Sequence, residues 1–126
     1  MIALQTPHES AARFRSAMLS PDQEQFMVQP VDGRLRPIGD TVVVALGSAN
    51  SVAVHPRDIF REAIRRNAVG VVIAHNHPSG DPTPSAEDKA LTERVSMGAE
   101  LLGINLIDHV IVTDGGYLSF AEGGLL

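Results

Sequence analysis

The spacing of apolar residues divides the chain into segments with strand-like and helix-like patterns. Two apolar runs, 41–46 ("TVVVAL") and 69–74 ("VGVVIA"), predict strands, and the β-branched residues of the first predict burial on both faces. Further strands are expected within 24–32 ("EQFMVQPVD") and 104–114 ("INLIDHVIVTD"), with a last short one at "YLSF". The turn residues at 32–34 ("DGR") predict a hairpin between the first two strands.

Three segments carry helix signals. The first opens at Thr6, where "TPHE" combines a capping residue, an early proline and a capping-box acid, and it is expected to reach about Leu19. Residues 56–68 place apolar side chains at helical spacing, after a short extended piece at 51–56. Residues 85–103 begin with a capping serine and stop at a glycine. Because strands and helices alternate, the expected fold class is α/β, with a mixed β-sheet flanked by helices.

Length and composition narrow the class of protein. The 126 residues fit one domain, 1–126, with a modest core. The absence of cysteine excludes disulfides, thiolate zinc sites and cysteine nucleophiles. No signal peptide and no membrane-spanning apolar run is visible in the sequence. A cytoplasmic protein without membrane contact is therefore the expectation.

The charge balance argues against one class of partner. A formal net charge of −5 disfavours broad electrostatic binding to nucleic acid, which usually needs a basic surface. One local exception is the arginine stripe of the second predicted helix, formed by Arg57, Arg61, Arg65 and Arg66. Such a stripe is more typical of a solvated helix face than of a binding site.

The stretch "HNHPSGDPTPSAED" carries the strongest chemical signal. His75 and His77 follow an apolar strand, and residues two apart in extended backbone point to the same side. Asp88 lies in the first turn of the next helix, and the proline-rich loop is stiff enough to fix its return path. Two imidazoles and one carboxylate suit zinc and leave a fourth position for water. The candidate metal ligands are therefore His75, His77 and Asp88.

Structural roles compete with this interpretation at each residue. A single histidine is more often structural than a metal ligand. Ser85 and Asp88 have the spacing of a capping box with a shorter acid, and acids favour the first turn of a helix in any case. The combination of His-x-His, a placed acid and a rigid loop is what favours a metal site.

Several metal-dependent families are excluded by what the chain lacks. Zinc deaminases need a Pro-Cys-x-x-Cys segment, and the chain has no cysteine. Hydrolases of the His-x-His-x-Asp-His type need an acid and a histidine where this chain has Ser79 and Gly80. Barrel amidohydrolases need about twice this length. The contiguous letters "HNH" do not indicate an HNH nuclease, whose motif residues are dispersed over a ββα unit.

The spacing His75-x-His77, seven residues, Ser85, two residues, Asp88 resembles the JAMM (MPN+) metalloprotease motif. The segments "HPRDIFREAIRRNAVGVVIAHNHPSGDPTPSAEDKALT" and "LLGINLIDHVIVTDGGYLSF" are similar to the RadC family, long labelled a DNA repair family. This similarity runs from about Glu24 to the C-terminus. It implies a JAMM/MPN core of cytidine-deaminase-like type, Zn²⁺ held by His75, His77 and Asp88, and hydrolysis of a peptide or isopeptide amide in a protein or peptide substrate.

The JAMM motif also has an upstream glutamate. Of Glu24 and Glu62, Glu24 stands where RadC-like sequences carry this residue. Zinc would lower the pKa of a bound water, Glu24 would take its proton and pass it to the leaving amine, and Ser85 would donate to the oxyanion. Helix capping competes for the same Ser85 side chain. The "DH" pair Asp108 and His109 is also typical of RadC-like chains and is interpreted as a structural pair of the core.

RadC-family chains usually carry a helix-hairpin-helix region before this domain. Its absence here implies a fragment or a short variant, and any association with DNA is expected to be indirect, through that region. A zinc-dependent amidohydrolase or peptidase is the favoured function, because a pure scaffold has no physical need for the intact motif. Two alternatives stay open: a non-catalytic protein- or DNA-associated module that uses the arginine stripe, and a metal-dependent nuclease.

Overall fold

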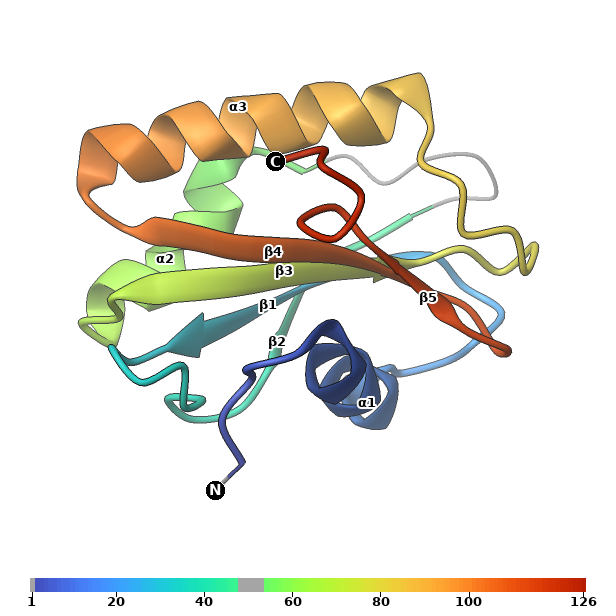
Figure 1. Cartoon of the computed structure of the whole chain (residues 1–126), viewed down its shortest axis with the longest axis horizontal. Coiled ribbons are helices and arrows are strands. Elements are labelled where there is room, and N and C mark those ends of the chain that lie inside the picture. The colour runs from blue at the N-terminus through green and yellow to red at the C-terminus, as the bar shows by residue number, and fades with distance from the viewer. Residues whose placement is uncertain (1, 48–53) are drawn as a thin grey trace.

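The computed structural model describes residues 2–47 and 54–126, which form a mixed sheet with helices on both faces (Figure 1). In chain order the elements are α1 (Pro7–Ala17), β1 (Gln25–Val31), β2 (Val42–Leu46), α2 (Pro56–Arg65), β3 (Gly70–Asn76), α3 (Ala86–Leu102), β4 (Asn105–Val112) and β5 (Tyr117–Ser119). The strand order is β2-β1-β3-β4-β5; β3 and β4 are parallel, and the other neighbouring pairs are antiparallel. The predicted α/β class is confirmed. Half of the extended piece expected at 51–56, namely 51–53, lies outside the described residues.

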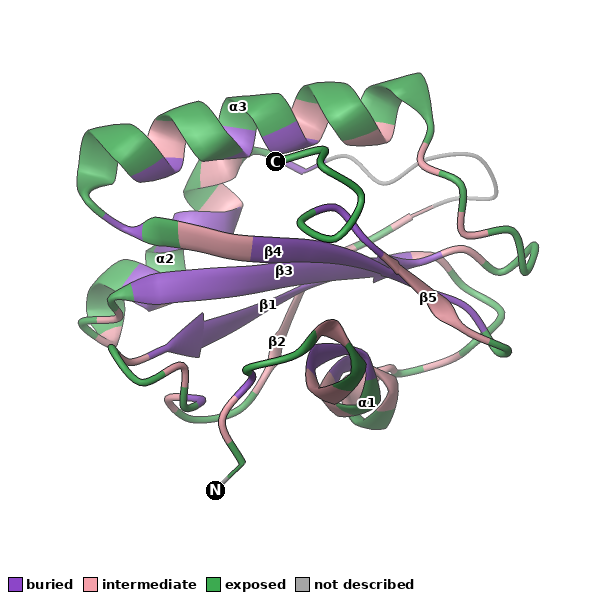
Figure 2. Cartoon of the chain, viewed as in Figure 1, coloured by how far each residue is buried: buried purple, intermediate pink, exposed green. Residues whose placement is uncertain are grey.

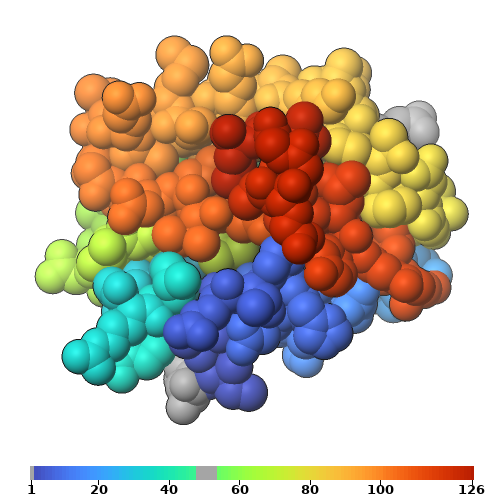
Figure 3. Space-filling model, viewed as in Figure 1, coloured from blue at the N-terminus to red at the C-terminus, as the bar shows by residue number. Residues whose placement is uncertain are grey.

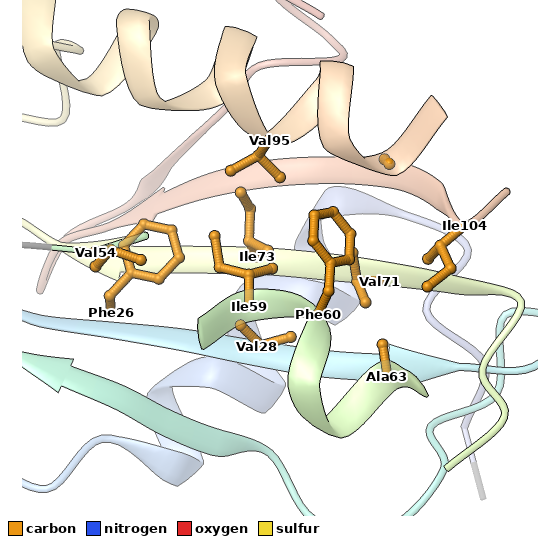
Figure 4. Close-up of a cluster of buried hydrophobic side chains, with 11 residues drawn as sticks. Phe26, Val28, Val54, Ile59, Phe60, Ala63, Val71, Ile73, Val95 and Ile104 are labelled. Atoms are coloured by element: carbon orange, nitrogen blue, oxygen red, sulfur yellow. The ribbon is translucent and has the colours of Figure 1, made fainter. Parts of the chain in front are cut away.

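The sheet separates two hydrophobic cores. α2 and α3 cover one face, where Phe60 and Val95 meet strand residues such as Val28 and Ile73 (Figure 4). α1 covers the other face and buries Phe14 there. β1 and β3 are buried along their whole length, as the purple central strands of Figure 2 show. A site built at the end of β3 therefore stands on a strand that is buried along its whole length.

Some element boundaries differ from those expected. α1 ends at Ala17, two residues before Leu19. α2 ends at Arg65, because Asn67 adopts a left-handed backbone conformation (φ 58°) that a helix cannot continue through. β3 runs beyond the predicted end at residue 74, so His75 belongs to the strand itself.

β2 differs from its predicted burial. Its side chains are only half-buried and Leu46 is 53% exposed, so the prediction of burial on both faces is wrong. Within the described sheet β2 pairs with β1 alone and forms an edge. A run of β-branched residues indicates a strand but does not distinguish an edge strand from a central one. The antiparallel pairing of β1 with β2, after a tight turn closed by Leu35 N donating to Asp32 O, confirms the predicted hairpin.

An irregularity in β4 decides which of its side chains face α3. The strand carries one extra residue, Ile107, between the partners of Val71 and Val72. Such a bulge shifts the alternation of side chains by one residue. Beyond it Val110 packs in the core beneath α1, and His109 faces α3.

Three arginines of the predicted stripe have partners within the fold. Arg61 and Arg65 pair with acids of their own helix, and Arg66 donates to two backbone carbonyls of the β1–β2 connection. Glu62, the alternative upstream glutamate, pairs with Arg65 and Arg66. None of the helices in the described part of the chain combines the length and hydropathy that a membrane crossing requires.

Candidate metal centre

The antiparallel pairing of β1 with β3 brings Glu24 to the motif. Phe26 pairs with His75. In an antiparallel pair a step back on one strand matches a step forward on the other. Two steps beyond the Phe26–His75 pair, Glu24 therefore comes opposite His77.

Donor atoms of the three predicted ligands converge on one point. His75 Nε2 lies 2.9 Å from His77 Nε2 and 3.2 Å from Asp88 Oδ1. His77 Nε2 lies 3.2 Å from Asp88 Oδ2. The side chain of His75 is buried, and those of His77 and Asp88 are partly accessible. The structure thus brings together a strand residue, a loop residue and a residue from the first turn of α3.

This donor set fits a zinc ion. Tetrahedral zinc has ligand bonds of about 2.0–2.1 Å, which places neighbouring ligand atoms about 3.3 Å apart. The donor separations of 2.9 and 3.2 Å are close to that value, so small side-chain shifts suffice. Three protein ligands leave one position open, as in catalytic zinc sites.

Glu24 lies beside the converging donors. One of its carboxylate oxygens and one ring nitrogen from each of His75 and His77 lie within 4.8 Å of one another. Its side chain is half-buried, and its backbone carbonyl accepts a hydrogen bond from Gly47 N at 2.8 Å. The carboxylate is therefore within reach of a water molecule held at the centre of the site.

Ser85 and Asp88 form the capping box expected at the start of α3. Ser85 Oγ accepts from Asp88 N at 3.0 Å, and Asp88 Oδ2 accepts from Ser85 N at 2.9 Å. The cap orients the carboxylate while its two oxygens face the histidines. Capping and ligand geometry therefore coexist at Asp88. At Ser85 the cap uses an oxygen lone pair and leaves the hydroxyl hydrogen free to donate.

The second ring nitrogen of His77 fixes its tautomer. His77 Nδ1 lies 2.8 Å from Asp81 O. A carbonyl oxygen can only accept, so Nδ1 carries the proton and Nε2 presents its lone pair to the site. Asp81 is itself fixed, because its carboxylate accepts from both Thr83 N and Thr83 Oγ1.

His109, which the sequence analysis interprets as a structural residue of the core, is buried as expected but also contacts a candidate ligand. Its Nε2 lies 2.8 Å from His75 Nδ1, and its Nδ1 lies 2.6 Å from Thr92 Oγ1. The ring is fully buried and stacks on Phe120, with centroids 4.4 Å apart. A histidine on the strand beside the metal strand was an available signal, but its orientation depends on the β4 bulge.

Asp108 fits the structural role expected of it. Its buried carboxylate accepts hydrogen bonds from Ser119 Oγ and Ala121 N. These bonds tie the segment after β5 to β4. In Figure 3 this red C-terminal segment lies between orange α3 and blue α1. Asp108 therefore helps to close the molecule over His109.

Three pKa shifts mark the site. A hydrogen bond that the Asp88 carboxylate accepts from His77 raises the pKa of His77, against the opposing effect of burial. Burial raises the pKa of the Asp88 carboxyl, but hydrogen bonds to His75 and His77 outweigh it and hold the pKa well below its usual range. Burial lowers the pKa of His109 well below its ordinary value, so this ring is neutral. The negative charges of Asp88 and Glu24 therefore both favour the protonated form of His77.

A shallow hollow adjoins His77. It is lined by the apolar side chains of Met18, Pro21, Pro78 and Val112 and by the polar side chains of Asn76, Thr113 and Asp114. Met18 and Val112 belong to the core beneath α1, so the hollow lies mainly on the side of the sheet opposite His75 and α3.

Comparison with known proteins identifies the family of the chain. The family model described as "RadC-like JAB domain" matches residues 4–125. A protein of Thermotoga maritima named "UPF0758 protein" is 46% identical over 114 residues, which cover 90% of this chain and 51% of that protein. A protein of the same name from Desulfitobacterium hafniense is 43% identical over 123 residues, covering 98% of this chain and 54% of the relative. The chain thus spans about half the length of these relatives.

These names establish a family without stating an activity. The match covers nearly the whole chain, including all five predicted site residues. The mixed sheet flanked by helices is consistent with a JAB/MPN domain. The chain therefore belongs to the RadC family and carries its RadC-like JAB domain.

Proposed function

We propose that this chain is a zinc-dependent hydrolase of the JAMM type, which cleaves a peptide or isopeptide amide bond in a protein or peptide substrate. The observation that carries the proposal is the convergence of His75, His77 and Asp88, with Glu24 at the same point. When bound, zinc supplies a Lewis acid and makes a water molecule more acidic. A carboxylate beside that water is what amide hydrolysis needs in addition.

Protein side chains supply proton transfer, charge balance and stabilisation of the developing oxyanion. Glu24 accepts the proton of the attacking water on a carboxylate oxygen and later gives it to the leaving amine, which would otherwise depart as an unstable anion. Asp88 balances positive charge at the site and stays ionised, since its pKa lies well below the usual range. Ser85 donates its free hydroxyl hydrogen to the oxygen on which negative charge develops.

The non-catalytic module is less well supported. The surface expected to bind its partner was the arginine stripe. Arg61, Arg65 and Arg66 of this stripe already pair with acids of the chain itself. A scaffold also has no use for four side chains aimed at one point. Association with DNA, through regions found in longer relatives, stays a separate proposal about the whole protein.

The proposal is tested with Glu24→Gln, using Glu62→Gln as the matched control. The zinc-loaded chain is incubated with a library of linear and lysine-linked peptides, and released amines are identified by mass spectrometry. Loss of a general base predicts a fall in turnover of about 10²–10⁴-fold for Glu24→Gln. Bound zinc should be unchanged, and Glu62→Gln should behave as wild type. If Glu24→Gln turns over as fast as wild type, the base is wrongly assigned. Absence of amine release from the zinc-loaded wild type would favour the binding module.

A further inference from the structure

The two candidate histidine ligands are held in different ways. His77 Nδ1 contacts a backbone carbonyl directly, so its tautomer is fixed without help. His75 Nδ1 contacts another histidine, which can either donate or accept. What determines the proton position on His75 must therefore lie further along the hydrogen-bond chain.

This chain of hydrogen bonds ends at the backbone carbonyl of Asp88. His75 Nδ1 meets His109 Nε2 at 2.8 Å, His109 Nδ1 meets Thr92 Oγ1 at 2.6 Å, and Thr92 Oγ1 donates to Asp88 O at 2.8 Å. The Asp88 carbonyl can only accept, and the hydroxyl has only one hydrogen. When Thr92 donates to Asp88 O, His109 must donate from Nδ1 and accept at Nε2. His75 then carries its proton on Nδ1 and presents a bare Nε2 to the site.

The opposite arrangement of protons is incompatible with a metal ligand. If Thr92 donates to His109, His109 donates to His75, and the proton of His75 sits on Nε2. That proton points at Asp88 Oδ1, 3.2 Å away, and occupies the lone pair an ion would need. The Thr92 hydroxyl is therefore the point at which the two arrangements differ.

Burial and aromatic stacking hold the side chains of this hydrogen-bond chain in place. His75, His109 and Thr92 are 1%, 0% and 3% exposed, so water does not replace a missing partner. Phe120 stacks on His109 and Phe26 on His75, with interplanar angles of 15° and 9°. Among the described residues no buried side-chain nitrogen or oxygen lacks a partner.

We propose that Thr92 and His109 are positioning residues that set the tautomer of His75 for metal binding. Because Thr92 donates to the backbone of Asp88, the relay also ties two candidate ligands to each other. The inference rests on the proposed zinc site but names residues outside the motif that defines it. It predicts that Thr92 affects His75 and leaves His77 unchanged.

The test compares Thr92→Val, which keeps the shape and loses the hydroxyl, with Thr92→Ser, which keeps the hydroxyl. Zinc affinity of the full chain is measured by chelator competition with Zn²⁺ alone. Loss of such an outer partner predicts a 10–100-fold weaker Kd for Thr92→Val. Thr92→Ser should stay within about threefold of wild type, since its hydroxyl restores the same donor. Equal Kd values for the two variants would overturn the relay.

A second measurement does not depend on any variant folding. In the zinc-loaded wild type, two-bond ¹⁵N–¹H spectra of histidine-labelled protein should show His75 and His109 protonated at Nδ1. A proton on His109 Nε2 would refute the relay even though zinc is bound. A wild type that binds no zinc would remove the proposed function together with this inference, so the two failures are distinguishable.

Discussion

At the scale of single residues, the two histidines of the motif differ in what surrounds them. His77 is partly accessible and bonds Asp88 and a backbone carbonyl. His75 is buried among aromatic rings and bonds a neutral histidine. Below its raised pKa, the accessible histidine also carries a proton on Nε2, which the Asp88 carboxylate attracts. A metal ion must displace that proton before it binds.

This proton makes zinc affinity depend on pH. Asp88 raises the pKa of His77, whereas Asp88 itself stays ionised because its own pKa is lowered. Below the raised pKa, zinc must compete with a proton, so affinity should fall by up to about tenfold per pH unit as pH decreases. Above it, affinity should level off. Chelator competition between pH 8 and pH 5.5 measures this directly. A Kd that does not change over this range would show that His77 is not a ligand.

The sequence indicated most of the site because most of it is local. His75 and His77 lie two residues apart, and Ser85 and Asp88 share one helical turn, so spacing alone suggested their geometry. Glu24 lies more than fifty residues away; it was assigned by family resemblance, and the β1–β3 register explains its position. His109 could not be assigned, because its direction depends on a bulge that no pattern of apolar residues reveals.

At the scale of elements, the N-terminus of α3 combines two functions. The Ser85–Asp88 capping box starts the helix and also orients a candidate ligand. The Thr6–Glu9 capping box starts α1 with the same hydrogen bonds. This second box lies far from the candidate metal motif in the sequence. Comparison of the two boxes separates helix capping from catalysis.

Substitutions at Ser85 make that separation measurable. Ser85→Ala should lower the free energy of unfolding by about 1 kcal/mol, and Ser85→Gly by a few tenths, because glycine is a tolerable N-cap. If the hydroxyl serves the oxyanion, both variants should lose turnover equally despite their different stabilities. Thr6→Ala is the control, with a cap-sized stability loss and unchanged turnover. Activity that follows stability across the three variants would limit Ser85 to capping.

Element type was predictable where local signals agree. Both capping boxes, the terminating glycine at Gly103 (φ 71°) and the apolar stripe of α2 were visible in the sequence. Strand position within the sheet was not, since β2 has the composition of a central strand and lies at an edge. Edge and centre are decided by which strands pair, and this is a property of the whole chain.

At the scale of the whole molecule, the candidate site joins four parts of the fold. β1, β3, β4 and α3 each contribute a group at or next to the metal position, and the C-terminal segment closes over His109. The unfolded chain cannot hold these groups together. Metal binding should therefore be coupled to global stability.

Zinc should stabilise the chain by mass action. Free zinc at about one hundred times its Kd raises the free energy of unfolding by about 2.7 kcal/mol, provided the unfolded chain does not bind it. The urea midpoint should rise without a change in slope, and a chelator should reverse the shift. A midpoint that is unaffected by stoichiometrically bound zinc would mean that the ion sits outside the folded core of the site.

The central claim is that His75, His77 and Asp88 hold one zinc ion. Its most direct test is the metal content of the purified chain after dialysis against zinc, measured for wild type and His77→Ala, with His8→Ala as a matched histidine control. One zinc per wild-type and His8→Ala chain, and much less than one in His77→Ala, is the predicted result. Zinc-free wild type, or equal zinc in all three proteins, would contradict the claim.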